Sequence, residues 1–97
     1  MPDFKVIQDV ASTIGRKYST GNMYLFGSYA KGSATKDSDI DILLEKGKIR
    51  GLIQLAGLKL DFEERLGIPV DVLTPDCLSK SFLENIRKER IMLYAGN

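Results

Sequence analysis

Three aspartates form the pattern in this sequence with the clearest chemical potential. Asp39 and Asp41 flank Ile40, and Asp71 lies between two valines in a second apolar run. Side chains alternate along a strand, which places Asp39 and Asp41 on one face with Cα atoms about 6.5–7 Å apart. If the two strands are neighbours, the three carboxylates repel one another unless a cation neutralises them. Oxygen ligands of this kind suit Mg²⁺ or Mn²⁺ in two-metal phosphoryl chemistry; the alternative is a solvated outer face of the sheet.

A glycine–serine pair precedes these acids, with ten residues between. Gly27 and Ser28 end a short apolar run, where a strand can meet a short helix. Glycine lets the backbone approach a ligand closely, and a helix N-terminus offers free N–H groups to phosphate. Ser28 can donate its hydroxyl group to phosphate or can cap the helix. Lys31 and Lys36 can neutralise phosphate oxygens or can simply be solvated. The spacing predicts a phosphate site beside a metal site.

The composition excludes several other kinds of site. The chain has 97 residues, with 14 Lys and Arg against 13 Asp and Glu, which excludes a polycation that holds nucleic acid by charge alone. It has no histidine, which excludes His-based catalysis and His-ligated metals. Its single cysteine, Cys77, excludes an intramolecular disulfide and a multi-Cys zinc site, and we assign it no chemistry. With no membrane-length apolar run and no secretory-signal pattern, we expect one reduced, cytoplasmic domain over residues 1–97.

Hydrophobic periodicity predicts the elements that position the acids. They are a helix over about 6–18, strands at 23–26, 39–44 and 69–73, a helix over about 49–66, and a C-terminal helix from about 79 that carries Leu93 on its apolar face. The expected buried face of the helix over 49–66 consists of Ile49, Leu52, Ile53, Ala56 and Leu60. This order predicts an α/β (α+β) domain, a small mixed β-sheet with helices packed on it.

Some apolar residues lie outside these expected buried faces. They are Leu55, Leu58 and Leu66 in the helix over 49–66, and Ile91, Met92 and Tyr94 near the end of the chain. Surplus apolar surface can mark an interface, although scattered exposed leucines are also normal. Both interpretations stay open, and an interface would allow the protein to form an oligomer.

The motif residues resemble a known family. The stretch Gly27-Ser28-Tyr29-Ala30-Lys31-Gly32, followed by Ser38-Asp39-Ile40-Asp41, is similar to the minimal nucleotidyltransferase (MNT) branch of the DNA polymerase β-like nucleotidyltransferase superfamily. The resemblance covers nearly the whole chain, because the order of elements also matches. It implies the nucleotidyltransferase fold, a triphosphate held at Gly27, Ser28 and Lys31, and two Mg²⁺ ions on the catalytic acids Asp39, Asp41 and Asp71. Many relatives carry arginine where Lys31 stands, so the bidentate geometry of a guanidinium is lost there.

The resemblance also implies a reaction and a partner. Relatives of this size resemble the antitoxin half of HEPN/MNT pairs, in which the MNT protein can adenylylate a tyrosine of its HEPN toxin partner. We therefore expect a Mg-dependent transfer of AMP from ATP to such a partner, with no membrane or nucleic-acid partner. Two alternatives remain: an inactive antitoxin that works by contact, and transfer to a small molecule or RNA. Turnover of ATP separates the first alternative from the expected enzyme, and a screen of acceptors decides the second.

Overall fold

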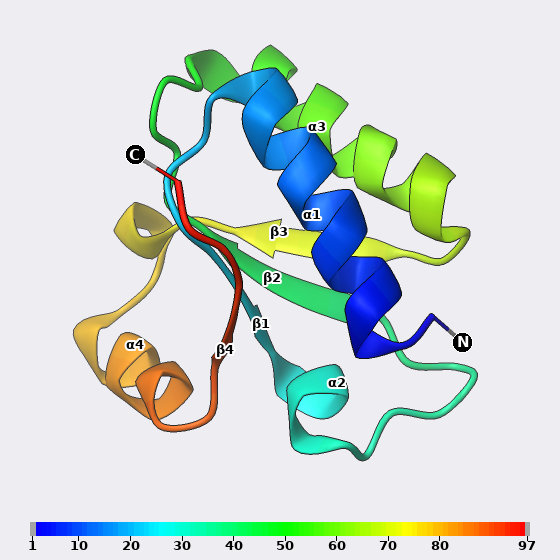
Figure 1. Cartoon of the computed structure of the whole chain (residues 1–97). Coiled ribbons are helices and arrows are strands. Elements are labelled where there is room, and N and C mark those ends of the chain that lie inside the picture. The colour runs from blue at the N-terminus through cyan, green and yellow to red at the C-terminus, as the bar shows by residue number, and fades with distance from the viewer. Residues whose placement is uncertain (1, 97) are drawn as a thin grey trace.

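Residues 2–96 are described by a computed structural model, in which a four-stranded mixed sheet has helices on both faces (Figure 1). The elements are α1 (Phe4–Tyr18), β1 (Met23–Phe26), α2 (Gly27–Lys31), β2 (Ile40–Leu44), α3 (Gly51–Leu66), β3 (Val70–Leu73), the 3₁₀ turn η1 (Pro75–Cys77), α4 (Lys80–Arg87) and β4 (Ile91–Tyr94). The strand order is β3-β2-β1-β4, with β2 and β3 parallel and the other pairs antiparallel. The expected small mixed sheet with packed helices is confirmed. Within residues 2–96, no helix is both long and apolar enough to cross a membrane.

The two faces of the sheet have separate apolar cores. Helices α1 and α3 cover one face, and α4 covers the other (Figure 1). Ile40 and Ile42 of β2 join the core under α1 and α3, whereas Leu43 joins the core under α4. Because side chains alternate along a strand, Asp41 faces the α4 side together with Leu43. The apolar neighbours of Asp41 therefore fix the direction of its carboxyl group, as the sequence predicted.

Helix α3 buries the face opposite to the one predicted. Its buried residues are Leu58, Phe62 and Leu66, whereas Leu52 is 82% exposed and Ile53 is 92% exposed. Both faces of this helix carry apolar residues at helical spacing, so periodicity alone does not show which face meets the sheet. The face with Leu58, Phe62 and Leu66 packs into the core in the second half of the helix, and this packing decides the orientation. The prediction for the 49–66 helix face was therefore wrong.

The end of the chain is a helix and a strand instead of one helix. Ser79 caps α4 by accepting a hydrogen bond from the Phe82 N–H group, and the helix ends at Arg87. The following apolar residues form β4, which pairs with β1 and closes that side of the sheet. Ile86 and Leu93 are seven residues apart, which suits one helical face but does not require it. The hydrogen bonds offered by the free edge of β1 decide in favour of a strand.

A half-buried carboxylate links α1 and α3 on the face of the sheet that these helices cover. Asp61 of α3 accepts hydrogen bonds from Lys17 of α1 at 2.7 Å and from Arg65 at 2.8 Å, and its side chain is 11% exposed. Hydrogen bonds from Lys17 and Arg65 hold the pKa of Asp61 below its ordinary value, against the opposing effect of burial. The carboxylate therefore stabilises the folded chain at neutral pH.

We expect Asp61→Asn to lower the free energy of unfolding by about 1–2 kcal/mol at pH 7, because charge-assisted hydrogen bonds are lost. The depressed pKa makes this stabilisation complete above the ordinary aspartate pKa and removes it as the pH falls through the folded-state pKa. Urea unfolding of both proteins at pH 7 and in acid measures the difference. Asp9→Asn is the control, since its ion pair with Lys5 is largely exposed and contributes little. An equal loss at both pH values would contradict the charge argument.

Candidate functional site

Asp41 and Asp71 lie side by side on neighbouring strands. They are direct register partners in the parallel pair formed by β2 and β3. Neighbouring strands are about 4.8 Å apart, and both residues belong to the alternating set that faces α4. Asp41 is half-buried and Asp71 is exposed. The structure thus brings these two predicted acids together on one face of the sheet.

Asp39 lies immediately before β2, whose first residue is Ile40, and its side chain is exposed. Its charge still acts on Asp41. Burial raises the pKa of Asp41 to about 6, with further contributions from the charges of Asp71 and Asp39 and from a hydrogen bond to Asp71. Over residues 2–96 no three or more His, Cys, Asp or Glu side chains are arranged as a metal centre. The acids therefore form a close pair with a third carboxylate at its margin, and their joint metal-binding role remains a prediction.

Gly27 brings the backbone against this acid pair. It follows Phe26, the residue that pairs with Asp41 between β1 and β2, and it begins α2. Its φ of 73° lies in the left-handed region that favours glycine, and a Cβ atom at this position would overlap the Oδ2 atom of Asp41. The turn therefore requires glycine both for its conformation and for its close approach to the carboxyl group.

Ser28 is the second residue of α2 and is half-buried beside this turn. The N-cap of α2 is Phe26, and no side chain caps the helix by a hydrogen bond. The alternative in which Ser28 serves as the cap is therefore wrong. Ser28 directly follows Gly27, the residue whose backbone lies against Asp41.

Within residues 2–96, neither of the two predicted lysines forms an ion pair with the three acids. Lys31 ends α2, and its Nζ atom is 3.5 Å from Oε2 of Glu89. Its side chain is about half exposed, so the contact with Glu89 holds it only loosely. Lys36 is exposed in the loop between α2 and β2. Glu89 is a residue that no sequence pattern indicated as a neighbour of the phosphate turn.

A polar pocket continues the acidic face toward the far end of β2. It has a volume of about 280 Å³ and is lined by Leu43, Glu45, Pro75, Lys80, Leu83, Glu84, Arg87 and Arg90. Leu43 and Glu45 lie two and four residues after Asp41, so their side chains point to the same face of the sheet as Asp41. The pocket and the acids therefore open on the same side. The Arg90 guanidinium lies 4.0 Å from the centre of the Tyr24 ring. Sequence reasoning missed this pocket because it assigned Arg90 to a continuous helix.

The arrangement has the donor chemistry of a phosphoryl-transfer site. Carboxylate oxygens from β2 and β3 face the space beside a glycine–serine turn, and their mutual repulsion favours a bound cation. The polar pocket lies on the same face of the sheet and begins at Leu43, two residues after Asp41 in β2. A metal-bound nucleotide is the ligand that these features suit.

Comparisons with known proteins identify the family of this chain. Residues 7–93 match the family model of the nucleotidyltransferase domain. A Methanocaldococcus jannaschii protein that is provisionally named a protein adenylyltransferase is 39% identical over 75 residues, which cover 77% of this chain and 81% of that protein. A solved structure of a provisionally assigned minimal nucleotidyltransferase has a TM-score of 0.80 and 30% identity, and it covers 93% of this chain and 95% of its own.

A more distant structure shares the fold. It is a complex of tri-AMPylated Shewanella oneidensis HEPN toxin with MNT antitoxin, with a TM-score of 0.72 and 19% identity, covering 95% of this chain and 72% of that one. The family model alone spans most of the chain, and the relatives agree with it in both sequence and fold. The chain therefore belongs to the minimal nucleotidyltransferase family and is a nucleotidyltransferase enzyme.

Proposed function

We propose that this nucleotidyltransferase moves AMP from Mg–ATP to a tyrosine hydroxyl group of a HEPN toxin and thereby acts as its antitoxin. The observation that carries the proposal is the Asp41–Asp71 pair beside the Gly27 turn. The provisional name of the Methanocaldococcus jannaschii relative supports a protein acceptor. The AMPylated toxin in the Shewanella oneidensis complex supports the class of partner.

The residues present fit magnesium. Asp39, Asp41 and Asp71 offer only hard oxygen ligands. Burial is the main cause of the raised pKa of Asp41, and the negative charges of Asp71 and Asp39 raise it further. These three side chains would hold the ions, with nucleotide phosphates as further ligands. When bound, the ions supply charge neutralisation and Lewis-acid activation of the phosphate. The chain itself supplies the turn at Gly27 and Ser28, which would hold the triphosphate.

In the proposed reaction, the acceptor oxygen attacks the α-phosphorus of ATP. The bond from this phosphorus to the oxygen that bridges to the β-phosphate breaks, and pyrophosphate leaves. The acceptor proton passes to the exposed Asp71 carboxylate and then to water. Asp71 is placed for this step, since it lies at the open side of the acid pair, whereas Asp41 is half-buried.

Labelled ATP, Mg²⁺ and a panel of acceptors test the proposal. The panel contains a HEPN toxin, the same toxin with its acceptor tyrosine changed to phenylalanine, an aminoglycoside and RNA. We expect label on the first toxin alone, together with release of pyrophosphate. Neutralisation of the toxin without any label would support the contact antitoxin instead, and label on the aminoglycoside or RNA would support the other alternative.

Lys31→Ala is expected to raise KM for ATP about 3- to 10-fold while kcat stays within about 2-fold, because an exposed lysine contributes mainly charge attraction to phosphate. Steady-state kinetics over a range of ATP concentrations measures both constants. Glu89→Gln is the matched variant, since it releases Lys31 from its ion pair and should leave KM equal or lower. An unchanged KM in Lys31→Ala would remove Lys31 from the nucleotide site.

A further inference from the structure

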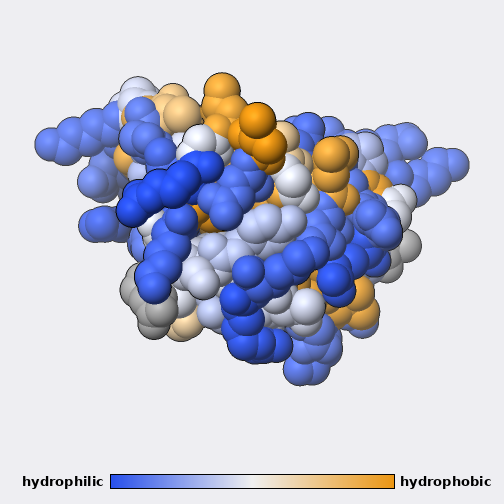
Figure 2. Space-filling model, turned by 90° about the horizontal axis from the view of Figure 1, so that it is seen from above, coloured by the Kyte–Doolittle hydropathy of each residue, from blue (hydrophilic) through white to orange (hydrophobic). Residues whose placement is uncertain are grey.

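The outer face of α3 carries a stripe of apolar side chains that the fold leaves in solvent. We call Leu52, Ile53, Ala56 and Leu60 the α3 stripe. Leu52 is 82% exposed, Ile53 is 92% exposed and Leu60 is 63% exposed. Figure 2 looks down on the helical side of the molecule and shows hydrophobic side chains gathered along its upper edge. A run of large apolar side chains on one helix face is typical of a surface that another macromolecule covers.

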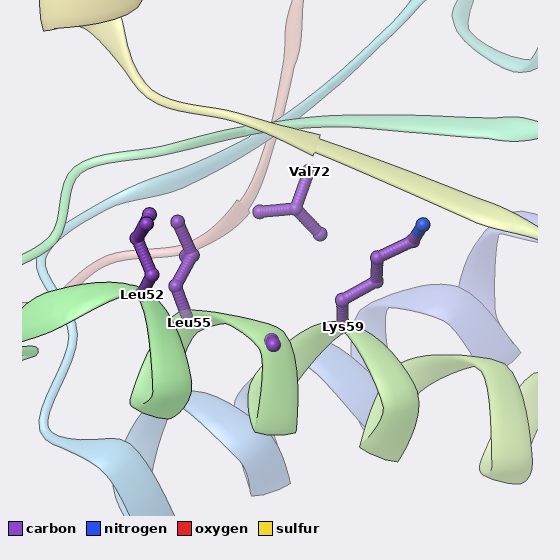
Figure 3. Close-up of a pocket in the computed structure, with 5 residues that line it drawn as sticks. Leu52, Leu55, Lys59 and Val72 are labelled. Atoms are coloured by element: carbon purple, nitrogen blue, oxygen red, sulfur yellow. The ribbon is translucent and has the colours of Figure 1, made fainter.

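A groove adjoins the α3 stripe. It lies between α3 and the edge strand β3, has a volume of about 280 Å³, and is lined by Leu52, Leu55, Ala56, Lys59 and Val72. Figure 3 shows that Leu52 and Leu55 project toward β3, whereas Val72 projects from β3 toward the helix. The lining is almost entirely apolar, with Lys59 at one end. The groove can receive an aliphatic side chain from a partner.

The α3 stripe and the acid pair lie on opposite sides of the sheet. Val72 packs against the core under α1 and α3, and Asp71 precedes it in the same strand. Alternation therefore sends the Asp71 side chain to the other face. This step rests on the proposed function: a toxin whose tyrosine reaches Asp41 and Asp71 must approach the protein from the α4 side of the sheet. That approach leaves the α3 stripe uncovered, so a different occupant is needed.

Charges at the two ends of the α3 stripe indicate which occupant fits. Lys48 and Arg50 precede the helix, and Glu64 lies in its last turn. None of these three side chains forms a salt bridge with another residue in the range 2–96. A two-fold axis through Ala56 would bring the N-terminal end of α3, with Lys48 and Arg50 just before it, to the C-terminal end of α3 in a second copy, where Glu64 lies. The basic end of each helix then meets the acidic end of the other.

We propose that the α3 stripe is a dimer interface in which two copies of this chain pair their α3 helices antiparallel around Ala56. Under this symmetry Leu52 of each copy contacts Leu60 of the other. The small side chain of Ala56 at the crossing point lets the two helices approach closely. The contact is isologous, so it closes at two copies and leaves both acid pairs accessible.

The size of the surface sets the strength of this dimer. A helix of 16 residues is about 24 Å long, so the interface lies at the low end of the specific range, below about 1,200 Å² in total. We therefore expect a concentration-dependent dimer with a dissociation constant on the order of 10–100 µM. Sedimentation velocity over 1 µM to 1 mM, without nucleotide, measures it. A monomer throughout this range would overturn the proposal.

Charge reversal tests the antiparallel register. Lys48→Glu should weaken the dimer at least about 10-fold, since it sets like charges against each other. Lys48→Glu combined with Glu64→Lys should restore the affinity to within about 3-fold, because the pair is re-formed with opposite signs. Failure of the double variant to restore the dimer would overturn this register. Leu60→Asp should also weaken self-association at least about 10-fold. Lys48, Leu60 and Glu64 are all exposed, so folding is preserved.

A cross-link tests the position of the two-fold axis. Ala56→Cys in a Cys77→Ser background carries one cysteine at the proposed crossing point. Under mild oxidation it should form covalent dimer at least about 10-fold faster than Ser33→Cys in the same background, an exposed loop position. Equal rates would overturn the proposal, as would Leu60→Asp weakening the toxin complex without changing self-association. These measurements involve no transfer of AMP, so they stay informative if the proposed function fails.

Discussion

Asp41→Asn is expected to reduce nucleotidyl transfer at least about 100-fold. The carboxylate lies at the centre of the acid group, beside Asp71 in the register and against the Gly27 turn. Its amide replacement keeps the shape of the side chain but removes the negative charge that a divalent cation needs. Initial rates with labelled ATP and saturating Mg²⁺ compare the variant with the parent. Asp37→Asn is the control, since Asp37 is exposed in the preceding loop.

The same variant should be more stable than the parent when no metal is present. The pKa of Asp41 is raised to about 6 in the folded protein, so the folded state keeps a proton that the unfolded chain has already lost. The parent therefore loses stability as the pH rises from about 4 to about 6, and the penalty is complete at neutral pH. Because Asp41 is only half-buried, solvent screening reduces the gain from Asp41→Asn to about 1 kcal/mol.

Thermal unfolding from pH 4 to pH 8 in EDTA measures this difference. We expect the gap between Asp41→Asn and the parent to open as the pH rises, and added Mg²⁺ with ATP to raise the Tm of the parent more than that of the variant. Retained activity in Asp41→Asn would exclude the acid pair as the reactive centre. A variant that loses both activity and stability would show that Asp41 supports the fold instead.

Gly27→Ala is expected to lose at least about 100-fold in activity and about 2–3 kcal/mol in stability. The left-handed backbone costs a residue with a side chain about 1 kcal/mol. The added Cβ atom would also overlap the Asp41 carboxyl group, so either the turn or the acid must move. A small displacement of a reactive group is enough for a large loss of rate. Urea unfolding and the transfer assay measure the two effects.

Gly32→Ala provides a matched control for this substitution. Gly32 has a φ of 74°, nearly that of Gly27, but a Cβ atom there meets nothing within 4 Å. The two variants share the backbone cost and differ in the collision with Asp41. We expect Gly32→Ala to lose about 1 kcal/mol and to stay within about 2-fold of parental activity. Equal activity losses in both variants would show that backbone strain, not contact with Asp41, explains the effect of Gly27→Ala.

Some of this site follows from local sequence. Asp41 stands between two isoleucines and Asp71 between two valines, and strand alternation then sends each carboxyl group away from the apolar core. Gly27 and Ser28 follow an apolar run, which marks the end of a strand. These relations join residues that are close together in the chain, so the local pattern is enough to predict the direction of each carboxyl group and the end of the strand. The two acid-bearing strands and the turn were predicted on this basis, and the structure contains them.

Other features needed contacts between distant residues. Both faces of α3 have apolar residues at helical spacing, and only the fit of Phe62 into the core decided that Leu52 and Ile53 lie in solvent. The segment after α4 became a strand because β1 has a free edge to pair with. A local pattern does not show how side chains will fit in the core or which strand edge is free for pairing. The predictions of the buried face of α3 and of one continuous C-terminal helix were wrong for this reason.

The sequence by itself predicted the residues that we propose carry the chemistry, and strand alternation determined which way Asp41 and Asp71 face from their strands. Tertiary structure decided that β2 and β3 are parallel neighbours, which places Asp41 beside Asp71, and that Gly27 meets Asp41 across the β1–β2 pair. It also decided that α3 presents its apolar stripe to solvent. Alternation along a strand is a property of the covalent backbone, whereas the choice of neighbouring strand and buried face depends on the packing of the whole chain.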